Sequence, residues 1–420
     1  MITASAIEEK LRGIVGSEHF RAATAADAVS GMQPKFVAEP ANEQELATLL
    51  SSANEAGIAV IPRGGGTKLG WGNPPKRADL VVSTARLKRV LEHAWADLTV
   101  SVEAGCPFET LQEKLAQHGQ RLALDGLWPQ RATIGGMLST NDSGALRLRF
   151  GALRDLIIGV TLALPDGTLA SSGGKVVKNV AGYDLPKLAT GAFGTLGIIT
   201  RAIFRLHPLP HSARTLSFSV ASVSDAERHV LAIQDSKLAH TGLQVRGDSA
   251  GQIVTDIWFE ATEAGLAAQE SQLRTLVGEV RWQQSEKGVW GGREGLWLLP
   301  TENAVIAKLS VLPSAIAKAL GLLEEIAKPR DVHFQYVIQA PGLGALRLEG
   351  EMSSLKAVVE RVRSELESGG ASLVVLHRPV ALESLEVWGA AGDALALMRS
   401  VKQQFDPKGT LNPGRFVGGI

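Results

Sequence analysis

Apolar residues recur at helical spacing after Asn42, and Glu45 completes a sequence there that resembles a helix capping box. Gly57 can end this predicted helix, because glycine readily adopts the left-handed conformation found at helix ends. A second amphipathic helix is expected between Pro107 and Gly119. Short apolar runs predict strands over 58–61, 80–83, 98–102, 156–164 and 168–171. This part of the chain is therefore predicted to form a small α+β unit.

A strict alternation of apolar and polar positions follows Gly197 and predicts one more strand. Its buried face is expected to consist of Ile198, Thr200, Ala202, Phe204 and Leu206. The sequence His207-Pro-Leu-Pro210 breaks this strand, because proline cannot donate to a strand ladder. We expect a domain boundary near residue 208.

The second half of the chain twice shows the order strand, helix, strand, strand, helix. The first copy is predicted as strands 216–221, 240–246 and 253–261 with helices 225–236 and 264–278. The second copy is predicted as strands 303–311, 332–339, 344–349 and 371–377 with helices 314–328 and 353–367. Two such units suggest two ferredoxin-like halves that share one antiparallel sheet. A last helix after Trp388 is predicted from Leu395, Met398, Val401 and Phe405.

The most informative chemistry lies in Pro62-Arg-Gly-Gly-Gly-Thr-Lys-Leu-Gly70. Three consecutive glycines let main-chain amides approach an anion closely, and Arg63 and Lys68 could add positive charge. A Rossmann fingerprint would need a helix inside this turn, whereas Trp71-Gly-Asn-Pro-Pro75 cannot continue one. We therefore predict a loop that binds the diphosphate of a dinucleotide, with a tight turn between strands as the alternative.

Two later segments have a similar character. Residues 128–144 combine hydroxyl groups, amides and glycine steps, which suits a backbone that lies against a polar, flat ligand; a polar surface loop is the alternative. The segment 173–197 again carries glycines with polar and charged side chains. It includes Lys175, Lys178, Asn179, Gly182, Tyr183, Asp184 and Lys187.

Composition narrows the functional classes. The length of 420 residues suggests at least two domains, and equal numbers of basic and acidic residues, 43 each, give no indication of nucleic-acid or anionic-membrane binding. The single cysteine, Cys106, excludes an internal disulfide and fits a reducing compartment. Met1 to Lys10 shows no secretory signal, and no apolar stretch approaches the roughly 20 residues of a membrane span. We expect a cytoplasmic protein, associated with a membrane only through partner subunits.

Four segments together resemble one family: 62–70, Thr133-Ile-Gly-Gly136, 191–200 and 406–415. This family is the vanillyl-alcohol-oxidase-type flavoproteins, whose FAD-binding fold is also called the PCMH fold. Within the family, the chain is similar to the FAD-binding subunits of bacterial glycolate oxidase complexes. The resemblance implies an α+β fold with a PCMH-type domain of two subdomains and an antiparallel-sheet cap domain.

The resemblance also implies boundaries and a cofactor site. The implied parts are a helical lead-in at 1–29, an FAD-binding domain at 30–208 with subdomains 30–90 and 91–208, a cap domain at 209–390, and a segment at 391–420 that returns to the FAD domain. Residues implied to bind FAD are Pro62, Arg63, Gly64, Gly65, Gly66, Thr67, Lys68, Leu69, Gly70, Thr133, Ile134, Gly135, Gly136, Ser139, Thr140, Asn141, Gly144, Gly197, Ile198, Ile199, Asn412 and Arg415. Some members attach FAD through a histidine where this chain has Thr67, so noncovalent FAD is expected.

Oxidation of a 2-hydroxy acid requires an anchor for the carboxylate, a base for the hydroxyl proton and a hydride acceptor. Trp290-Gly-Gly-Arg293 resembles a cap element of the family, which makes Arg293 a candidate anchor. Arg378, His333 and Tyr336 are further catalytic candidates on predicted cap strands. Catalytic relatives carry a histidine-rich metal motif that this chain lacks, so we expect no metal site.

Two functions are expected from this resemblance. The first is an FAD-dependent subunit that oxidises glycolate or D-lactate within a complex containing a catalytic FAD-linked glycolate oxidase subunit and an iron–sulfur subunit. The alternative is a flavin-binding structural or electron-relay subunit without turnover of its own. A regulatory protein that binds no flavin is a third, less favoured interpretation.

Overall fold

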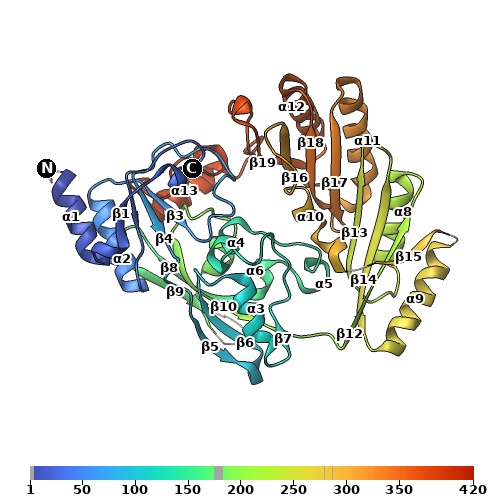
Figure 1. Ribbon diagram of the computed structural model, residues 1–420, viewed down its shortest axis with the longest axis horizontal. Coiled ribbons are helices and arrows are strands. Elements are labelled where there is room, and N and C mark those ends of the chain that lie inside the picture. The colour runs from blue at the N-terminus through green and yellow to red at the C-terminus, as the bar shows by residue number, and fades with distance from the viewer. Residues whose placement is uncertain (1–3, 175–182, 279, 286) are drawn as a thin grey trace. The chain divides into compact units, whose positions relative to one another are not determined.

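The computed structural model describes residues 4–420 except 175–182, 279 and 286. The chain divides into two compact units (Figure 1). The first unit contains residues up to 143, 150–209 and 391–420, and the second contains 144–149 and 210–390. No helix in the described part of the chain is long and apolar enough to cross a membrane. The predicted residues Lys175, Lys178, Asn179 and Gly182 lie outside the described residues.

The first unit begins with a small sheet in the order β1-β2-β4-β3, in which β4 pairs in parallel with both β2 and β3. The predicted helix is present as α2, and the side chain of its N-cap residue Asn42 accepts a hydrogen bond from the N–H of Glu45. Leu46, Leu49 and Leu50 of α2 are buried against this sheet. The elements are α1 (Ala4–Val15), β1 (Phe20–Ala22), β2 (Phe36–Ala38), α2 (Glu43–Glu55), β3 (Val60–Arg63) and β4 (Leu80–Ser83).

A second sheet in the first unit is antiparallel and has the order β5-β6-β10-β8-β9. Its strands are β5 (Val90–Ala94), β6 (Thr99–Glu103), β8 (Ile157–Ala163), β9 (Leu169–Gly173) and β10 (Ile198–Arg205). The predicted alternation after Gly197 is present, since Thr200, Ala202 and Phe204 are buried. The accompanying elements are α3 (Phe108–Ala116), β7 (Gln120–Arg121), α4 (Ile134–Thr140), α5 (Arg147–Phe150), α6 (Leu153–Leu156), α7 (Leu185–Ala189) and β11 (His207–Pro208).

The last part of the chain returns to the first unit. Helix α13 (Leu395–Phe405) precedes a segment in which Leu411 forms a parallel bridge with Val60 of β3. The N–H of Val60 donates to the carbonyl of Thr410, and the N–H of Asn412 donates to the carbonyl of Val60. The end of the chain is thereby fixed beside the strand that leads into the glycine loop.

The second unit is an eight-stranded antiparallel sheet in the order β15-β12-β14-β13-β17-β18-β16-β19. The two predicted ferredoxin-like halves are confirmed, and they join where β13 pairs with β17. Helices α8, α9, α11 and α12 cover one face of this sheet (Figure 1). The elements are β12 (Ser212–Ser219), α8 (Val223–Asp235), β13 (His240–Asp248), β14 (Ile253–Ala261), α9 (Glu263–Val277), β15 (Trp282–Ser285), α10 (Gly292–Gly295), β16 (Ala304–Ser310), α11 (Ile316–Ala327), β17 (His333–Gln339), β18 (Leu343–Glu349), α12 (Met352–Ser368) and β19 (Ser372–His377).

Two strands differ from the predictions for the second unit. Strand β12 begins four residues before the predicted 216–221 and ends two residues earlier. Strand β15 was not predicted, because Trp282-Gln-Gln-Ser285 has neither an apolar run nor an alternation. It is nevertheless paired with β12 and completes the first half as a βαββαβ unit.

Candidate functional site

A cavity that is open to solvent lies within the first unit, at the carboxyl end of β3; its empty space, solvent opening included, is about 710 Å³. The glycine loop forms one wall, and the remaining wall comes from α4, the start of β10 and the end of the chain. Its lining residues are Pro62, Arg63, Gly64, Gly65, Gly66, Thr67, Lys68, Leu69, Thr84, Ala104, Thr133, Gly135, Gly136, Ser139, Thr140, Phe193, Gly194, Gly197, Ile198, Ile199, Asn412 and Arg415. Segments that are distant in the sequence therefore meet around one space.

The glycine row presents main-chain donors to this cavity. Within the described residues, no protein group accepts a hydrogen bond from the N–H groups of Gly64, Gly65, Gly66 and Thr67. Gly66 has a φ of +73°, which an L side chain rarely adopts. A run of adjacent amides with no protein partner is suited to an anion, because a backbone N–H is a strong and nearly obligatory donor.

The first two glycines are also required by packing within the protein. A Cβ at Gly65 would lie 1.7 Å from the carbonyl oxygen of Arg131, and a Cβ at Gly64 would lie 2.1 Å from Oγ1 of Thr133. Any side chain at either position would push the loop away from the segment that precedes α4. Close contact between these two backbone segments thus depends on glycine.

Helix α4 shapes the cavity wall but offers no free N–H donors from its first turn, because these amides already have protein partners. Ile134 and Gly135 donate to the carbonyls of Cys106 and Ala104, at 3.0 and 2.7 Å. The N–H of Gly136 donates to Oγ1 of the N-cap residue Thr133. The glycine loop is accordingly the main source of open amide donors in this cavity.

Both cations of the loop are paired with buried carboxylates. Arg63 Nη1 lies 2.7 Å from Oδ1 of Asp27, and Lys68 Nζ lies 3.1 Å from Oδ2 of Asp142. Lys68 also lies over the rings of Trp71 and Trp128, with Nζ 5.7 and 5.4 Å from the ring centroids. Each cation predicted for this loop therefore has a carboxylate partner within the protein.

The returning end of the chain completes the wall of the cavity. Arg415 is buried and donates through Nη2 to the carbonyls of Leu69 and Trp71, both at 2.7 Å. Burial lowers the pKa of Arg415 to about 10. Asn412 donates through Nδ2 to the carbonyl of Phe193, while its Oδ1 is buried without a partner among the described residues. Asn412 therefore retains one acceptor for a donor of a bound molecule.

Four residues predicted for the cofactor site lie outside the cavity lining: Gly70, Ile134, Asn141 and Gly144. Gly144 belongs to the second unit. Four lining residues were not predicted: Thr84, Ala104, Phe193 and Gly194. Phe193 and Gly194 stood within the glycine-bearing segment 191–200, and their spacing there could have identified them.

The predicted catalytic residues are dispersed over the second unit. His333 is exposed on β17, whereas Tyr336 is buried on the helix-covered face of that strand, where burial raises its pKa. Arg378 donates to the carbonyl of Glu383, and burial lowers its pKa. Arg293 lies on α10, which contacts β17. The structure does not bring these four side chains together.

A different arginine on the open face of the second-unit sheet has the geometry of an anion anchor. Arg246 on β13 binds Asp256 through Nε at 2.8 Å and through Nη2 at 3.3 Å, and Asp256 is fully buried. Ser217 and Gln244 also donate to Asp256. Among the described residues, nothing accepts a hydrogen bond from Nη1 of Arg246, so a fixed guanidinium retains a free edge.

Arg246 lies opposite a valine that is also close to α10, the helix that carries Arg293. Arg246 pairs in register with Val337 across β13 and β17, and a Cβ at Gly292 of α10 would lie 3.2 Å from Val337. Sequence reasoning missed Arg246, because its only signal was a basic residue at an alternate position of a predicted strand. In the described ranges, no group of three or more His, Cys, Asp or Glu residues could hold a metal ion.

Two stretches of this chain match known protein families. Residues 34–173 match the family described as FAD binding domain, and residues 389–416 match the C-terminal domain of FAD linked oxidases. These two stretches contain most of the residues that line the cavity.

Several relatives are similar over nearly the whole chain. A glycolate oxidase subunit, GlcD, of Bacillus subtilis is 26% identical over 99% of this chain and 97% of its own length. D-lactate dehydrogenase of Archaeoglobus fulgidus is 28% identical over 91% of each chain. D-2-hydroxyglutarate dehydrogenase of Xanthomonas citri is 27% identical over 91% of this chain and 89% of its own.

Solved structures show the same fold. Alkyldihydroxyacetonephosphate synthase has a TM-score of 0.76 at 16% identity, covering 99% of this chain and 86% of its own. p-Cresol methylhydroxylase has a TM-score of 0.77 at 14% identity, covering 99% and 97%. These likenesses confirm the predicted α+β fold with a PCMH-type domain and a large antiparallel sheet.

Proposed function

We propose, from the matches to the FAD binding domain and to the C-terminal domain of FAD linked oxidases, that this chain oxidises a small 2-hydroxy acid, glycolate or D-lactate, to the 2-oxo acid. The observation that carries the proposal is similarity over at least nine-tenths of the chain to a glycolate oxidase subunit, a D-lactate dehydrogenase and a D-2-hydroxyglutarate dehydrogenase. Lactate and 2-hydroxyglutarate are 2-hydroxy acids by their chemistry, as is glycolate.

The cavity in the first unit fits the proposed cofactor. The open amides of Gly64, Gly65, Gly66 and Thr67 are donors suited to a diphosphate. Asn412 offers an acceptor to an N–H or O–H group of the same ligand.

We propose that FAD is held without a covalent bond. Thr67 stands in the glycine loop and lines the cavity, and threonine has no nucleophilic nitrogen. Among the described residues that line this cavity there is no His, Cys or Tyr. Flavin should therefore be released into the supernatant when the protein is denatured.

Bound FAD would accept the hydride of the substrate carbon, and the chain's own residues would bind the substrate carboxylate. We propose Arg293 as one anchor and Arg246 as a second. The buried carboxylate of Asp256 fixes the guanidinium plane of Arg246, so little side-chain freedom would be lost on binding an anion. Arg378 and His333 remain candidates for other substrate contacts, whereas Tyr336 lies in the core under the helices, away from the open face of the sheet.

The proposed physiological context is a complex. Electrons taken from a 2-hydroxy acid must leave the flavin, and an iron–sulfur cluster needs about four thiolates, whereas this chain has one cysteine. We therefore propose a catalytic FAD-linked glycolate oxidase subunit and an iron–sulfur subunit as partners. Similarity to the glycolate oxidase subunit GlcD supports this proposal.

Anaerobic mixing of the purified protein with glycolate, D-lactate or D-2-hydroxyglutarate tests the activity. Loss of the oxidised-flavin absorbance with one of these acids, together with formation of the 2-oxo acid, is the expected result. Arg246→Met and Arg293→Met should raise KM for that acid at least tenfold. A flavin that stays oxidised until a partner subunit is added would instead support the structural or electron-relay role.

A further inference from the structure

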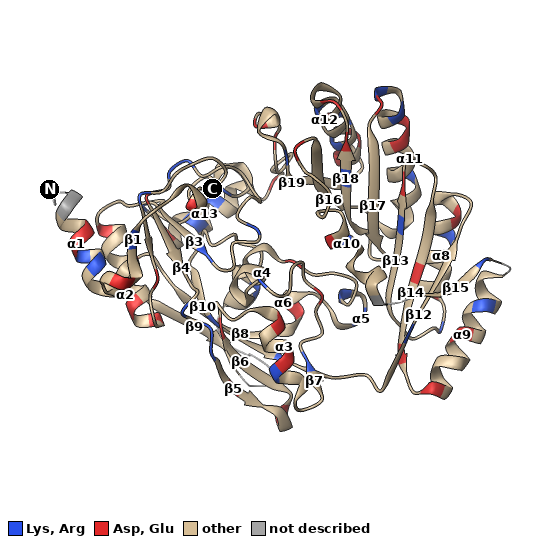
Figure 2. Cartoon of the chain, in the orientation of Figure 1, with Lys and Arg blue, Asp and Glu red and all other residues tan. Residues whose placement is uncertain are grey.

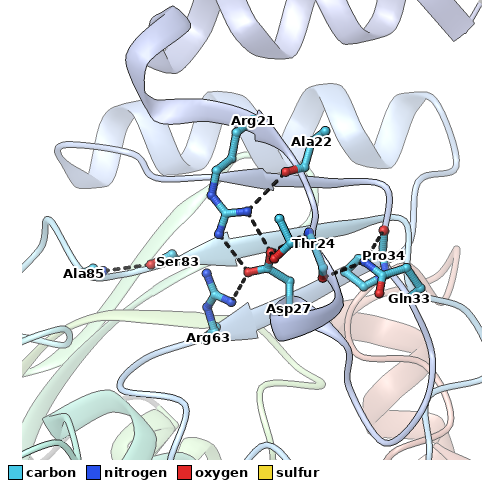
Figure 3. A network of polar contacts seen from close by, with 9 residues as sticks. All are labelled: Arg21, Ala22, Thr24, Asp27, Gln33, Pro34, Arg63, Ser83 and Ala85. Carbon is cyan, nitrogen blue, oxygen red and sulfur yellow. Dashed lines mark hydrogen bonds and ion pairs between the residues drawn. The ribbon is translucent and has the colours of Figure 1, made fainter.

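Two arginines share one buried carboxylate beside the glycine loop (Figure 3). Arg21 forms a bidentate pair with Asp27, with Nη1–Oδ2 at 2.7 Å and Nη2–Oδ1 at 2.8 Å. Arg63 approaches Oδ1 of Asp27 through Nη1 at 2.7 Å. Asp27 is only 3% exposed, so its position is fixed by packing as well as by charge.

The short turn that contains Asp27 holds the carboxylate in place. The N–H and Oγ1 of Thr24 both donate to Oδ2 of Asp27, at 2.8 and 3.0 Å. Hydrogen bonds from Arg21, and then from Thr24 and Arg63, lower the pKa of Asp27 well below its ordinary value despite burial. Asp27 therefore stays ionised throughout the physiological pH range.

Arg63 is directed by this carboxylate while part of it stays available. It is the last residue of β3 and precedes the four open amides, and its side chain lines the cavity. Within the described residues, Asp27 is its one side-chain partner, so Nε and Nη2 have no acceptor. A guanidinium that is held at one nitrogen can present its other edge to an anion in a defined orientation.

The charges of this cluster do not cancel. Arg21 and Arg63 bring two positive charges and Asp27 brings one negative charge, so these three side chains together carry one positive charge; Glu39 acts on Arg21, which does not line the cavity. By contrast, Lys68 and Asp142 form a neutral pair at the same cavity. Asp27 thus orients Arg63 without removing its attraction for a diphosphate.

We propose that Asp27 is a positioning residue for the cofactor site, which holds Arg63 so that the free edge of its guanidinium binds the diphosphate of FAD. Asp27 and Arg21 lie before residue 34, where the match to the FAD binding domain begins. The segment 20–27 is therefore a functional extension of that domain. The inference rests on FAD binding in this cavity and is independent of the identity of the substrate.

The substitution Asp27→Asn tests the proposal, because a role in orienting Arg63 and a role in local charge predict opposite changes in the affinity for FAD. The substitution raises the local charge by one, so charge alone would tighten the binding of anionic FAD. Loss of orientation would weaken it. We expect the Kd of the apoprotein for FAD, measured by quenching of flavin fluorescence, to rise about tenfold or more.

Asp79→Asn is the matched control. Asp79 is also shared by two cations, Lys35 and Arg77, and accepts a hydrogen bond from Ala59, but none of these residues lines the cavity. The Asp79→Asn substitution should change the Kd for FAD by less than about twofold. Thermal unfolding of both apoproteins measures any general destabilisation.

Tighter or unchanged FAD binding by Asp27→Asn would overturn the proposal, as would an equal loss in both variants. Arg63→Lys keeps the positive charge but removes the planar guanidinium group, so this variant should bind FAD about as weakly as Asp27→Asn. Wild-type affinity of Arg63→Lys for FAD would overturn the proposal, even if Asp27→Asn does not fold. A wild-type apoprotein that binds no FAD would overturn both this inference and the cofactor assignment. Wild-type FAD binding without bleaching by 2-hydroxy acids would overturn only the proposed activity.

Discussion

At the scale of single residues, adjacent glycines of one loop serve different physical purposes. Gly64 and Gly65 permit close packing against residues 131–133, and Gly66 permits a left-handed backbone. The sequence indicated the loop correctly, because three glycines in a row have few other uses. It could not indicate the packing role, because Arg131 and Thr133 are more than 60 positions away.

Gly65→Ala should destabilise the first unit by about 1–3 kcal/mol, because its Cβ would overlap the carbonyl oxygen of Arg131. Urea denaturation of the apoprotein measures this change. Gly70→Ala in the same loop is the control, since a Cβ there meets nothing within 4 Å and its φ is not positive. Equal stability of the two variants would contradict the packing argument.

Cys106 should be inert in the folded protein, because burial raises the pKa of its thiol to about 11. A thiol of the unfolded chain has a pKa of about 8.5. Between these values the folded state binds more protons, so stability should fall as pH rises, by up to about 1.4 kcal/mol per pH unit. Urea denaturation from pH 8 to pH 10.5 should show a steeper loss for wild type than for Cys106→Ala; equal slopes would argue against the buried thiol as the cause.

Asp27 illustrates what the sequence could not provide at this scale. Arg63 was predicted from its place beside the glycine row, but its partner lies 36 positions earlier, where the capping box Thr24-Ala-Ala-Asp27 indicates a helix start and not a partner for a distant arginine. Charge pairs that close over such distances depend on how β1 and β3 are brought into one sheet. Across the molecule, acidic and basic side chains are mixed on outer helices such as α9 and α11 (Figure 2), so charge pattern alone does not distinguish this pair.

At the scale of elements, apolar periodicity predicted helices and central strands well. Elements without it were missed, notably β15 and the short edge strands β1 and β5. Edge strands need only one apolar face or none, so tertiary pairing determines them. The polar network on the open face of the second-unit sheet could not be predicted from the sequence either, because the buried Asp256 binds polar residues from separate strands.

The segment after α13 depends on one buried ion pair. Lys402 and Asp406 bind each other, Lys402 Nζ also donates to the carbonyls of Thr195 and Leu411, and Asp406 accepts from the N–H groups of Thr410 and Leu411. Burial lowers the pKa of Lys402. This cluster holds Asn412 and Arg415 in place at the cavity.

Asp406→Ala should cost about 3–5 kcal/mol, because Lys402 would be left buried without its carboxylate. FAD affinity should fall as well, since the segment carries two lining residues. Chemical denaturation and fluorescence titration measure the two effects. Asp393→Ala makes the same change of charge at an exposed position of the same C-terminal segment and should leave both values near wild type.

At the scale of the whole molecule, each unit has a hydrophobic core of its own. We expect two calorimetric unfolding transitions. The described residues that line the cavity all belong to the first unit, so FAD should raise the unfolding temperature of that unit alone. At a concentration one hundred times its Kd, FAD should add about 2.7 kcal/mol to the free energy of unfolding of the first unit. A single transition, or equal shifts of both, would show that the units unfold together; Asp27→Asn should reduce the shift of the first transition.

The returning segment has a consequence for biosynthesis. The ribosome makes the strand that leads into the glycine loop early, but Asn412 and Arg415, which close the same cavity, emerge only after the entire second unit. At about 5–20 residues per second, the roughly 350 residues between β3 and Asn412 take roughly 17 to 70 s to translate. A chain truncated after residue 390 should thus contain a folded second unit but an incomplete nucleotide pocket, which makes flavin loading a late step of maturation.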